Sequence, residues 1–332
     1  MVERFDGYWN PAKAAKAKGI VFRFIADAQA KLLALRSSER DLITDVPRDL
    51  ADNLRNNPGI AVVHSQVGAY NALNFTVNAP PPYDLGRDPA IREAVALAID
   101  RKALLQKVWA DNAAESTTWI PPQVLGPYAS TVKGPSYDPK RAAQVLDAAG
   151  WLPAPDGIRL KGGGRLSLAH VVAGPGDSDP RDSAAAAQVI QDRLKRIGVE
   201  TRIEVPDPAA GLARANNGQY DILQYIANQN SANPCLLPDL FFYSKGKARA
   251  RFAAPGGATD TALEACRSAQ TIDGVRKASA DAIHQLVDVE HVVVPLIGLY
   301  RIWAMKGNVA GFLPSPSLTN QRWESLYLTK GK

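Results

Sequence analysis

Segments rich in β-branched and aromatic residues alternate with helical segments along this chain, and that alternation limits the possible folds more than any other feature. Residues 20–25 (IVFRFI) and 60–64 have the composition of strands, and residues 47–55 begin with a proline that suits a first helical turn. The other expected strands are 41–45, 70–77, 166–172, 199–205, 221–225 and 292–299, continued by 301–305, and the other expected helices are 27–35, 88–107, 138–149, 183–197, 259–270 and 273–287. Alternating strands and helices predict an α/β fold.

A run of prolines gives the clearest break in this pattern. In residues 79–84 (APPPYD), each proline fixes its own φ and pushes the preceding residue out of the helical region. We therefore expect a domain boundary near this stiff, extended segment.

The size and charge of the chain restrict its partners. Its 332 residues are enough for two domains. Lys plus Arg is 39 and Asp plus Glu is 33, which gives a formal net charge of +6. This excess is spread along the chain without a dense basic run, so we expect no nucleic-acid partner. The apolar run 292–299 is far shorter than the ~18 residues that cross a bilayer.

The first residues bear on the cellular compartment. Charged residues lead directly into Tyr8-Trp9-Asn10-Pro11, without the apolar core of an export signal. We therefore expect either that the protein is cytoplasmic or that its true beginning is missing.

The chain has no recognisable constellation for catalysis or for binding a metal or cofactor. It contains neither a Gly-x-Ser-x-Gly elbow nor a phosphate loop. Residues 161–165 (KGGGR) precede a strand and not a helix, so they predict a hairpin. His284 and His291 could share a helical face, but the second lies close to a strand, and His64 and His170 are far away. We expect no enzymatic activity, no metal site and no cofactor.

Cys235 and Cys266 are the two cysteines of the chain. Their spacing does not match a metal site, and two thiols alone do not hold a structural zinc ion. They could form one disulfide if the protein is exported, or remain as two buried thiols.

Several segments, in their order and spacing, resemble one protein family. They are Leu35–Ile43 (LRSSERDLI), Asp88–Arg101 (DPAIREAVALAIDR), Gly218–Asp221 (GQYD), and Val294–Ile297 (VPLI) followed by Gly307–Phe312 (GNVAGF). This ordered set resembles the family-5 extracellular solute-binding proteins, which include dipeptide, oligopeptide and nickel receptors.

The resemblance implies an α/β, two-lobe, periplasmic-binding-protein-like fold of type II, in which the lobes close on a ligand by hinge motion. Because family members are longer at the N-terminus, it also implies an incomplete first lobe, built from residues 1–75 and 301–332. Residues 76–300 would form the second lobe, with the hinge near 74–78 and 298–303. An incomplete lobe should leave sheet edges unpaired and apolar faces uncovered.

By the same resemblance, the ligand site involves the strand that follows Asp221 and the loop behind it. The candidate ligand-binding residues there are Tyr225, Asn228, Gln229, Asn230 and Asn233. Asn233 stands where peptide receptors have an aspartate for the ligand's ammonium group, and the loop 174–178 lacks the base that dipeptide receptors use. An amide cannot supply the charge that strengthens such pairs, so a neutral or polyhydroxylated ligand fits better. The alternative is that these amides only cap turns.

Three further candidates for ligand contact are Trp119, Tyr70 and Asn74. Trp119 begins a Pro-rich loop from which family members often place aromatic residues near the cleft, where stacking adds contact at low entropy cost. A core position is the alternative for Trp119. For Tyr70 and Asn74, on the strand that enters the hinge, the alternative is partial burial without ligand contact.

These features favour a substrate-binding component of an ABC importer for peptides or a related polar solute. It would be a monomer, periplasmic or extracellular and membrane-associated, and would deliver its ligand to the permease subunits. Two alternatives stay open, an intracellular ligand-sensing module and a truncated, non-functional receptor remnant.

Overall fold

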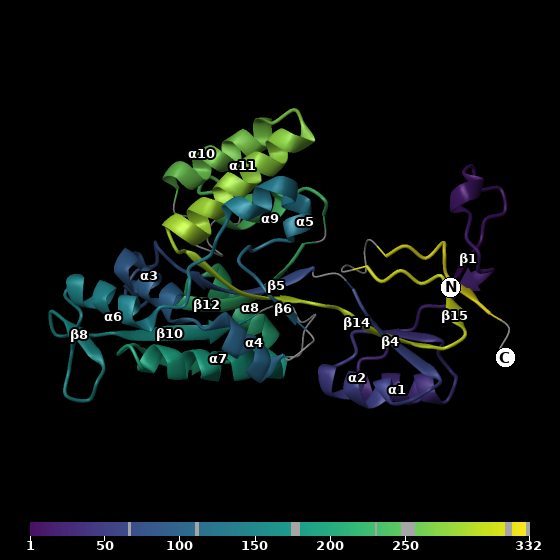
Figure 1. The fold of residues 1–332 in the computed structure, drawn as a ribbon, viewed down its shortest axis with the longest axis horizontal. Helices are drawn as coiled ribbons and strands as arrows, with labels where there is room; N and C mark the ends of the chain where they lie inside the picture. Colours follow the sequence, from purple (N-terminus) through teal and green to yellow (C-terminus); the bar gives the residue numbers. More distant parts are fainter. Residues whose placement is uncertain are drawn as a thin grey trace. The chain divides into compact units, whose positions relative to one another are not determined.

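The chain divides into two compact units, which are described separately. The computed structural model describes residues 1–65, 68–109, 113–173, 180–229, 231–246, 256–315 and 321–329. Unit 1 comprises Met1–Gly68 and Tyr300–Lys332, and unit 2 comprises Ala69–Leu299 (Figure 1).

Unit 2 is built on a mixed six-stranded sheet. Its strands, in spatial order, are β11 (Glu200–Glu204), β10 (Ser167–Val172), β12 (Ile222–Asn228), β5 (Ala69–Phe75), β13 (Val293–Leu299) and β6 (Ala113–Glu115). β10 is parallel to β11 and β12, whereas β5 is antiparallel to both of its neighbours, β12 and β13.

Helices cover both faces of this sheet (Figure 1). The main core packs Leu73 and Ile226 of the sheet with Ile91, Leu146 and Ile190 from three helices. The helices on that side are α3 (Pro89–Ala98), α4 (Arg101–Val108), α6 (Pro139–Ala148) and α7 (Pro180–Lys195). The others are α5 (Pro122–Leu125), α8 (Pro208–Asn216), α9 (Leu236–Phe242), α10 (Gly257–Ser268) and α11 (Ile272–His284), the last continued by a π-turn over Gln285–Val289.

The expected single helix over residues 88–107 is wrong, because the structure has two helices there. Ile99 is extended and ends α3, and the side chain of Asp100 then accepts a hydrogen bond from the backbone N–H of Ala103 at 2.9 Å. This cap starts α4 in a new direction. The guanidinium of Arg101 donates to the carbonyl of Pro295 at 2.6 Å, and its burial lowers the pKa of Arg101 to about 10. Arg101 therefore ties α4 to β13.

The hairpin expected at residues 161–165 is confirmed. β8 (Arg159–Lys161) pairs with β9 (Gly164–Arg165) and, on its other side, with β7 (Leu152–Pro153). Gly162 and Gly163 have φ of 58° and 80°, which a two-residue turn of this hand requires.

Unit 1 contains a three-stranded antiparallel sheet of order β3 (Leu42–Thr44), β14 (Ile302–Lys306) and β4 (Ile60–His64). On one face, Ile43 and Ala304 pack with Leu35 of α1 (Ala28–Arg36) and Leu54 of α2 (Arg48–Arg55). On the other face, Trp303 packs with residues near the C-terminus that surround the pair β15 (Val309–Ala310) and β16 (Tyr327–Leu328).

The strand expected at residues 20–25 is largely absent. Only Gly19–Ile20 (β2) is a strand, paired with β1 (Val2–Glu3). Residues 21–25 have no strand partner in the described part of the chain, and the Phe24 side chain is 95% exposed. A segment with the composition of a strand does not form a β-ladder unless a neighbouring strand is present, since its backbone N–H and C=O groups need hydrogen-bond partners.

The chain crosses between the units at 68/69 and 299/300, and not at the prolines. Residues 69–75, which we had expected in the first lobe, form β5 and pair along their length with β12 and β13. Residues 79–84 follow β5 and therefore lie within unit 2.

A disulfide joins Cys235 to Cys266, which resolves the open alternative for the two cysteines. Cys235 precedes α9, Cys266 lies near the end of α10, and their Cα atoms are 6.3 Å apart.

Reducing this disulfide should lower the free energy of unfolding by about 3–4 kcal/mol, because it closes a loop with a sequence separation of 31 residues. Urea unfolding with and without a reductant measures this change. The Cys235→Ser/Cys266→Ser variant is the control. Its urea midpoint should equal that of the reduced protein and should not change when the reductant is added. Equal midpoints for reduced and oxidised protein would contradict the prediction.

Candidate functional site

Four strands of the unit 2 sheet end at the same edge. β10, β11, β12 and β13 run in one direction, so their carboxyl ends meet there, together with the start of β5. The register aligns Ala69 with both Asn228 and Leu299. Both crossings between the units therefore leave the sheet at this edge. In open α/β sheets, ligands bind outside the carboxyl ends of the strands, which makes this edge the candidate site.

The amide residues that follow β12 lie at this edge. Asn228 closes β12 and is partly buried. Gln229 is buried, and its Nε2 donates to the carbonyls of Ser231 at 2.6 Å and Asn233 at 2.9 Å. The Oδ1 of Asn233 accepts from the backbone N–H of Cys235 at 3.0 Å. Gln229 and Asn233 therefore shape the loop, as the turn-capping alternative requires.

Two parts of the expected site lie outside the described residues. They are Asn230 and the loop 174–178. The structure therefore neither supports nor contradicts the roles assigned to them.

The aromatic candidates Trp119 and Tyr225 belong to a buried cluster. The ring centroid of Trp119 is 5.1 Å from that of Phe242 and 5.6 Å from that of Phe241, and Tyr225 lies 6.0 Å from Phe241. Trp119 is 1% exposed. This burial supports the core interpretation of Trp119, and the cluster anchors α9 to the sheet beneath the Gln229 loop.

Tyr70 lies near the edge, but Asn74 does not. Tyr70 pairs with Ala227 and is buried. Asn74 is also buried, and its Nδ2 donates to the carbonyl of Leu223 at 3.1 Å. Five strand positions separate Asn74 from Ala69, which is about 17 Å at the rise of a β-strand. The structure thus gives Asn74 a role within the sheet, away from the other candidates.

A buried polar network near the edge escaped the sequence analysis. His170 Nε2 lies 3.1 Å from Gln224 Oε1, and Gln224 Nε2 donates to the carbonyl of Ser183 at 3.0 Å. Asn71 Nδ2 donates to Ser183 Oγ at 3.4 Å. The network joins β10, β12 and β5 to α7. The sequence signal for this network is the presence of polar residues at central positions of otherwise apolar strands.

Burial shifts the pKa values of two ionisable groups of this sheet in opposite directions. It lowers the pKa of His170 to about 4, so the imidazole is neutral at pH 7. It raises the pKa of Asp221, at the start of β12, to about 6, although Asp221 accepts hydrogen bonds from the backbone N–H groups of Ala169 at 2.8 Å and Leu85 at 3.2 Å. Neither group is placed to contact a ligand outside the carboxyl edge.

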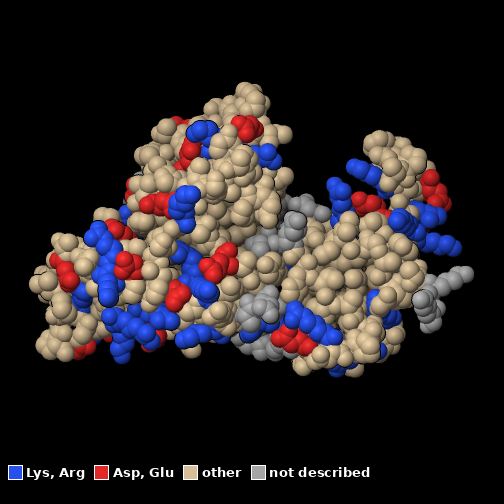
Figure 2. All heavy atoms as spheres, viewed as in Figure 1, with Lys and Arg blue, Asp and Glu red and all other residues tan. Residues whose placement is uncertain are grey.

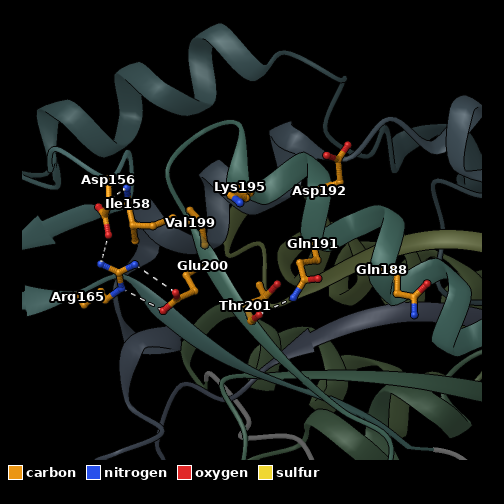
Figure 3. Close-up of a pocket in the computed structure, with 10 residues that line it drawn as sticks. All are labelled: Asp156, Ile158, Arg165, Gln188, Gln191, Asp192, Lys195, Val199, Glu200 and Thr201. Atoms are coloured by element: carbon orange, nitrogen blue, oxygen red, sulfur yellow. Dashed lines mark hydrogen bonds and ion pairs between the residues drawn. The ribbon is translucent and has the colours of Figure 1, made fainter.

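A pocket of about 530 Å³ lies where β11 begins, at the edge of the sheet opposite the candidate site (Figure 3). Arg165 bridges Asp156 at 2.7 Å and Glu200 at 3.1 Å, and these carboxylates raise the pKa of Arg165. In these exposed ion pairs each of the three charged groups already has a partner of opposite charge. The pocket is therefore not the candidate site.

The described residues contain no group of three or more His, Cys, Asp or Glu side chains that could hold a metal ion. In the described ranges, no helix is both long and apolar enough to span a bilayer. On the face drawn in Figure 2, basic and acidic side chains of unit 2 are interspersed.

Solved structures identify the fold. NikA from Brucella suis, in complex with Fe(III)-EDTA, has a TM-score of 0.81 and 21% identity over 98% of this chain and 64% of its own. AppA from Bacillus subtilis, in complex with a nonapeptide, has a TM-score of 0.75 and 20% identity over 92% and 59%. The fold is the α/β type II fold of periplasmic binding proteins, as expected.

The family follows from the sequence match. The model of the bacterial extracellular solute-binding proteins, family 5 (middle), matches residues 1–249, so the chain belongs to this family. It is 32% identical to the glutathione-binding protein GsiB of Shigella flexneri over 208 residues, which is 62% of this chain and 36% of that protein. It is 26% identical to Di/tripeptide-binding protein 2 of Pseudomonas aeruginosa over 317 residues, 93% of this chain and 55% of that protein. The chain thus spans between a third and two thirds of these proteins.

Replacing His170 should change how stability depends on pH. Below pH 6.5 the unfolded histidine takes up a proton, whereas the folded one does so only near pH 4, so its contribution is present above 6.5 and is lost on acidification. The stability difference between wild type and His170→Gln should therefore grow by about 3 kcal/mol from pH 4 to pH 7.

Denaturant unfolding at several pH values measures this difference. Asp221 acts with the opposite sign, since its raised pKa gives stability that is lost as pH rises from about 4 to about 6. Asp221 is present in both proteins, so it cancels in the comparison. Parallel pH profiles for the two proteins would show that His170 does not titrate in this way.

Gln229→Ala should lower the free energy of unfolding by about 1–3 kcal/mol, because it removes two hydrogen bonds that hold the loop after β12. Asn228→Ala is the matched control at the neighbouring position and should change stability by less than about 0.5 kcal/mol. The two variants can be compared by thermal unfolding. Equal stabilities would show that the loop does not depend on Gln229.

Proposed function

We propose that this chain is the substrate-binding component of an ABC importer, or a large part of it, and that it takes up peptides or a related polar solute. The observation that carries the proposal is the carboxyl edge of the unit 2 sheet. The loop rich in amides and both chain crossings meet there, in a chain that belongs to a solute-binding family. The names of two relatives, a glutathione-binding and a di/tripeptide-binding protein, support the ligand class.

In this proposal the two units are the lobes, and the ligand binds in the interlobe cleft. The crossings at 68/69 and 299/300 act as the hinge. They are neighbours in the register of one sheet, so a modest change in backbone angles at both could move a lobe as a rigid body. Binding energy would then shift the population towards the closed form.

The amide side chain of Asn233 limits the chemical groups of a ligand that this position can bind. An amide oxygen can accept one hydrogen bond from an ammonium group but adds no charge to it. In the structure, Asn233 Oδ1 already accepts from the N–H of Cys235. The proposal therefore favours a ligand recognised through neutral hydrogen-bonding groups, such as a capped peptide or a polyhydroxylated solute, over a small zwitterionic peptide.

The partners follow from the same role. The protein would work outside the cytoplasm, in the periplasm or at the outer face of the membrane, and dock on the permease subunits as a monomer. It would release its ligand unchanged and carry out no chemistry.

Thermal unfolding with candidate ligands tests the proposal. Glutathione, dipeptides, tripeptides, capped peptides and neutral polyols are added singly to the full chain. A true ligand at 100 times its Kd should stabilise the fold by about 2.7 kcal/mol, which raises the Tm by several degrees. At least one of these solutes should raise the Tm in a saturable way. If none of them does, the receptor proposal is wrong.

Asn228→Ala should weaken binding of such a ligand about tenfold, because it removes an amide at the carboxyl edge. Asn217→Ala is the matched control, an exposed asparagine before β12 at the opposite edge of the same sheet. Titration calorimetry measures both. An equal affinity in the two variants would remove Asn228 from the site.

A further inference from the structure

The loop after β12 is fixed at both of its ends, and its second end is held by helices on one face of the sheet. At its start, Asn228 pairs with Ala69 of β5. At its end, Cys235 is bonded to Cys266 of α10 through the disulfide. Figure 1 shows α10 beside α11, on the side of the sheet that also carries α9. The position of the loop therefore depends on these helices as well as on the sheet.

A buried hydroxyl makes a second link beside the disulfide. Ser279 of α11 is 0% exposed, and its Oγ donates to the carbonyl of Pro234 at 2.9 Å. Cys235 and Cys266 pack with Ala278 of α11 in a small apolar cluster. Two adjacent loop residues are thus tied to two helices, one by a covalent bond and one by a hydrogen bond. The hydrogen bond lies in the interior, where leaving a polar group without a partner costs most.

The hydrogen bonds inside the loop set its shape but do not fix its place. The N–H of Asn233 donates to Ser231 Oγ at 3.0 Å, and Gln229 Nε2 donates to the carbonyls of both residues. These partners all belong to the loop, so they move together if its end at Cys235 is released. Asn233 is exposed and lies two residues before Cys235, so such a release would displace it directly.

The helices that hold the loop are fixed by contacts of their own. Arg267 of α10 pairs with Asp239 of α9 through hydrogen bonds of 2.6 and 3.0 Å. The Cζ of Arg267 also lies 3.9 Å from the ring centroid of Tyr243. Leu263 of α10 packs with Ala282 of α11 and with Tyr243. Because these contacts do not involve the disulfide or Ser279, loss of either link should free the loop without unfolding the helices.

We propose that Cys235, Cys266 and Ser279 are positioning residues for the ligand: they are buried, and they act by holding the loop after β12 in place at the carboxyl edge. This inference rests on the proposed function, because it takes that loop as part of the ligand site. If the loop occupies its binding position in only a fraction of molecules, the apparent affinity falls by that fraction. The disulfide and Ser279 therefore raise the affinity by pre-organisation, without adding a contact to the ligand.

Hydrogen exchange measures the position of the loop without any ligand. The backbone amide of Asn233 should exchange about tenfold faster in Cys235→Ser/Cys266→Ser than in wild type, and about threefold faster in Ser279→Ala. Leu104→Ala is the control for lost stability, since it leaves a cavity in the main core on the other face of the sheet, and it should not change this exchange. Equal exchange in wild type and in both loop variants would overturn the proposal, as would the same acceleration in Leu104→Ala.

Titration calorimetry measures the consequence for binding. The probes are the solutes of the thermal unfolding test that bind wild type, with S-methylglutathione in place of glutathione, because a blocked thiol cannot exchange with the disulfide. Each probe should bind Cys235→Ser/Cys266→Ser about tenfold more weakly than wild type and should bind Leu104→Ala with unchanged affinity.

The two measurements separate this inference from the receptor proposal. Faster exchange of the Asn233 amide with unchanged affinity would overturn the positioning role and leave the receptor proposal intact. An equal loss of affinity in Leu104→Ala would show a general effect of stability and would also overturn the positioning role. If no probe binds wild type, the receptor proposal is wrong and the positioning role is wrong with it.

Discussion

The hydrogen bonding of β5 along both of its edges is the constraint on which the rest of the molecule depends. β12 pairs with one edge and β13 with the other, so the first and last strands of unit 2 lie side by side. The entry and exit of the chain are thereby fixed at one edge of one sheet. Six of the seven residues of β5 are buried, so neither crossing can shift without exposing the core.

The buried core of unit 2 and its candidate ligand site thus lie in different parts of the unit. The faces of the sheet carry the apolar core, the aromatic cluster around Trp119 and the network around His170. The carboxyl edge carries loops, where backbone and amide groups can reach a ligand without disturbing the core. Gln229 connects the two, since its side chain is buried while the loop that it holds reaches the surface.

Local signals in the sequence predicted most helices, strands and the α/β class. Asp27 and Asp138 cap α1 and α6, and Gly162 and Gly163 have the positive φ that the turn of the predicted hairpin requires. Features that depend on distant partners were not predictable. Residues 21–25 have strand composition but no neighbouring strand, and the distance of Asn74 from the edge follows from the register of β5. Asn228 lies at the carboxyl edge, and its assignment to the ligand site rests on the family pattern and not on any local rule.

The order of strands in unit 1 has a consequence for biosynthesis. β14 is the central strand of that sheet, and it pairs Ile43 with Ala304, residues at nearly opposite ends of the chain. A ribosome must therefore finish all of unit 2 before unit 1 can assemble its sheet. During that time β3 and β4 emerge without their shared neighbour, and pairing across such a long separation forms slowly. Residues 1–68 of unit 1 are made before unit 2, but they can complete their sheet only after β14 has been made, so they are the part for which a chaperone would matter most.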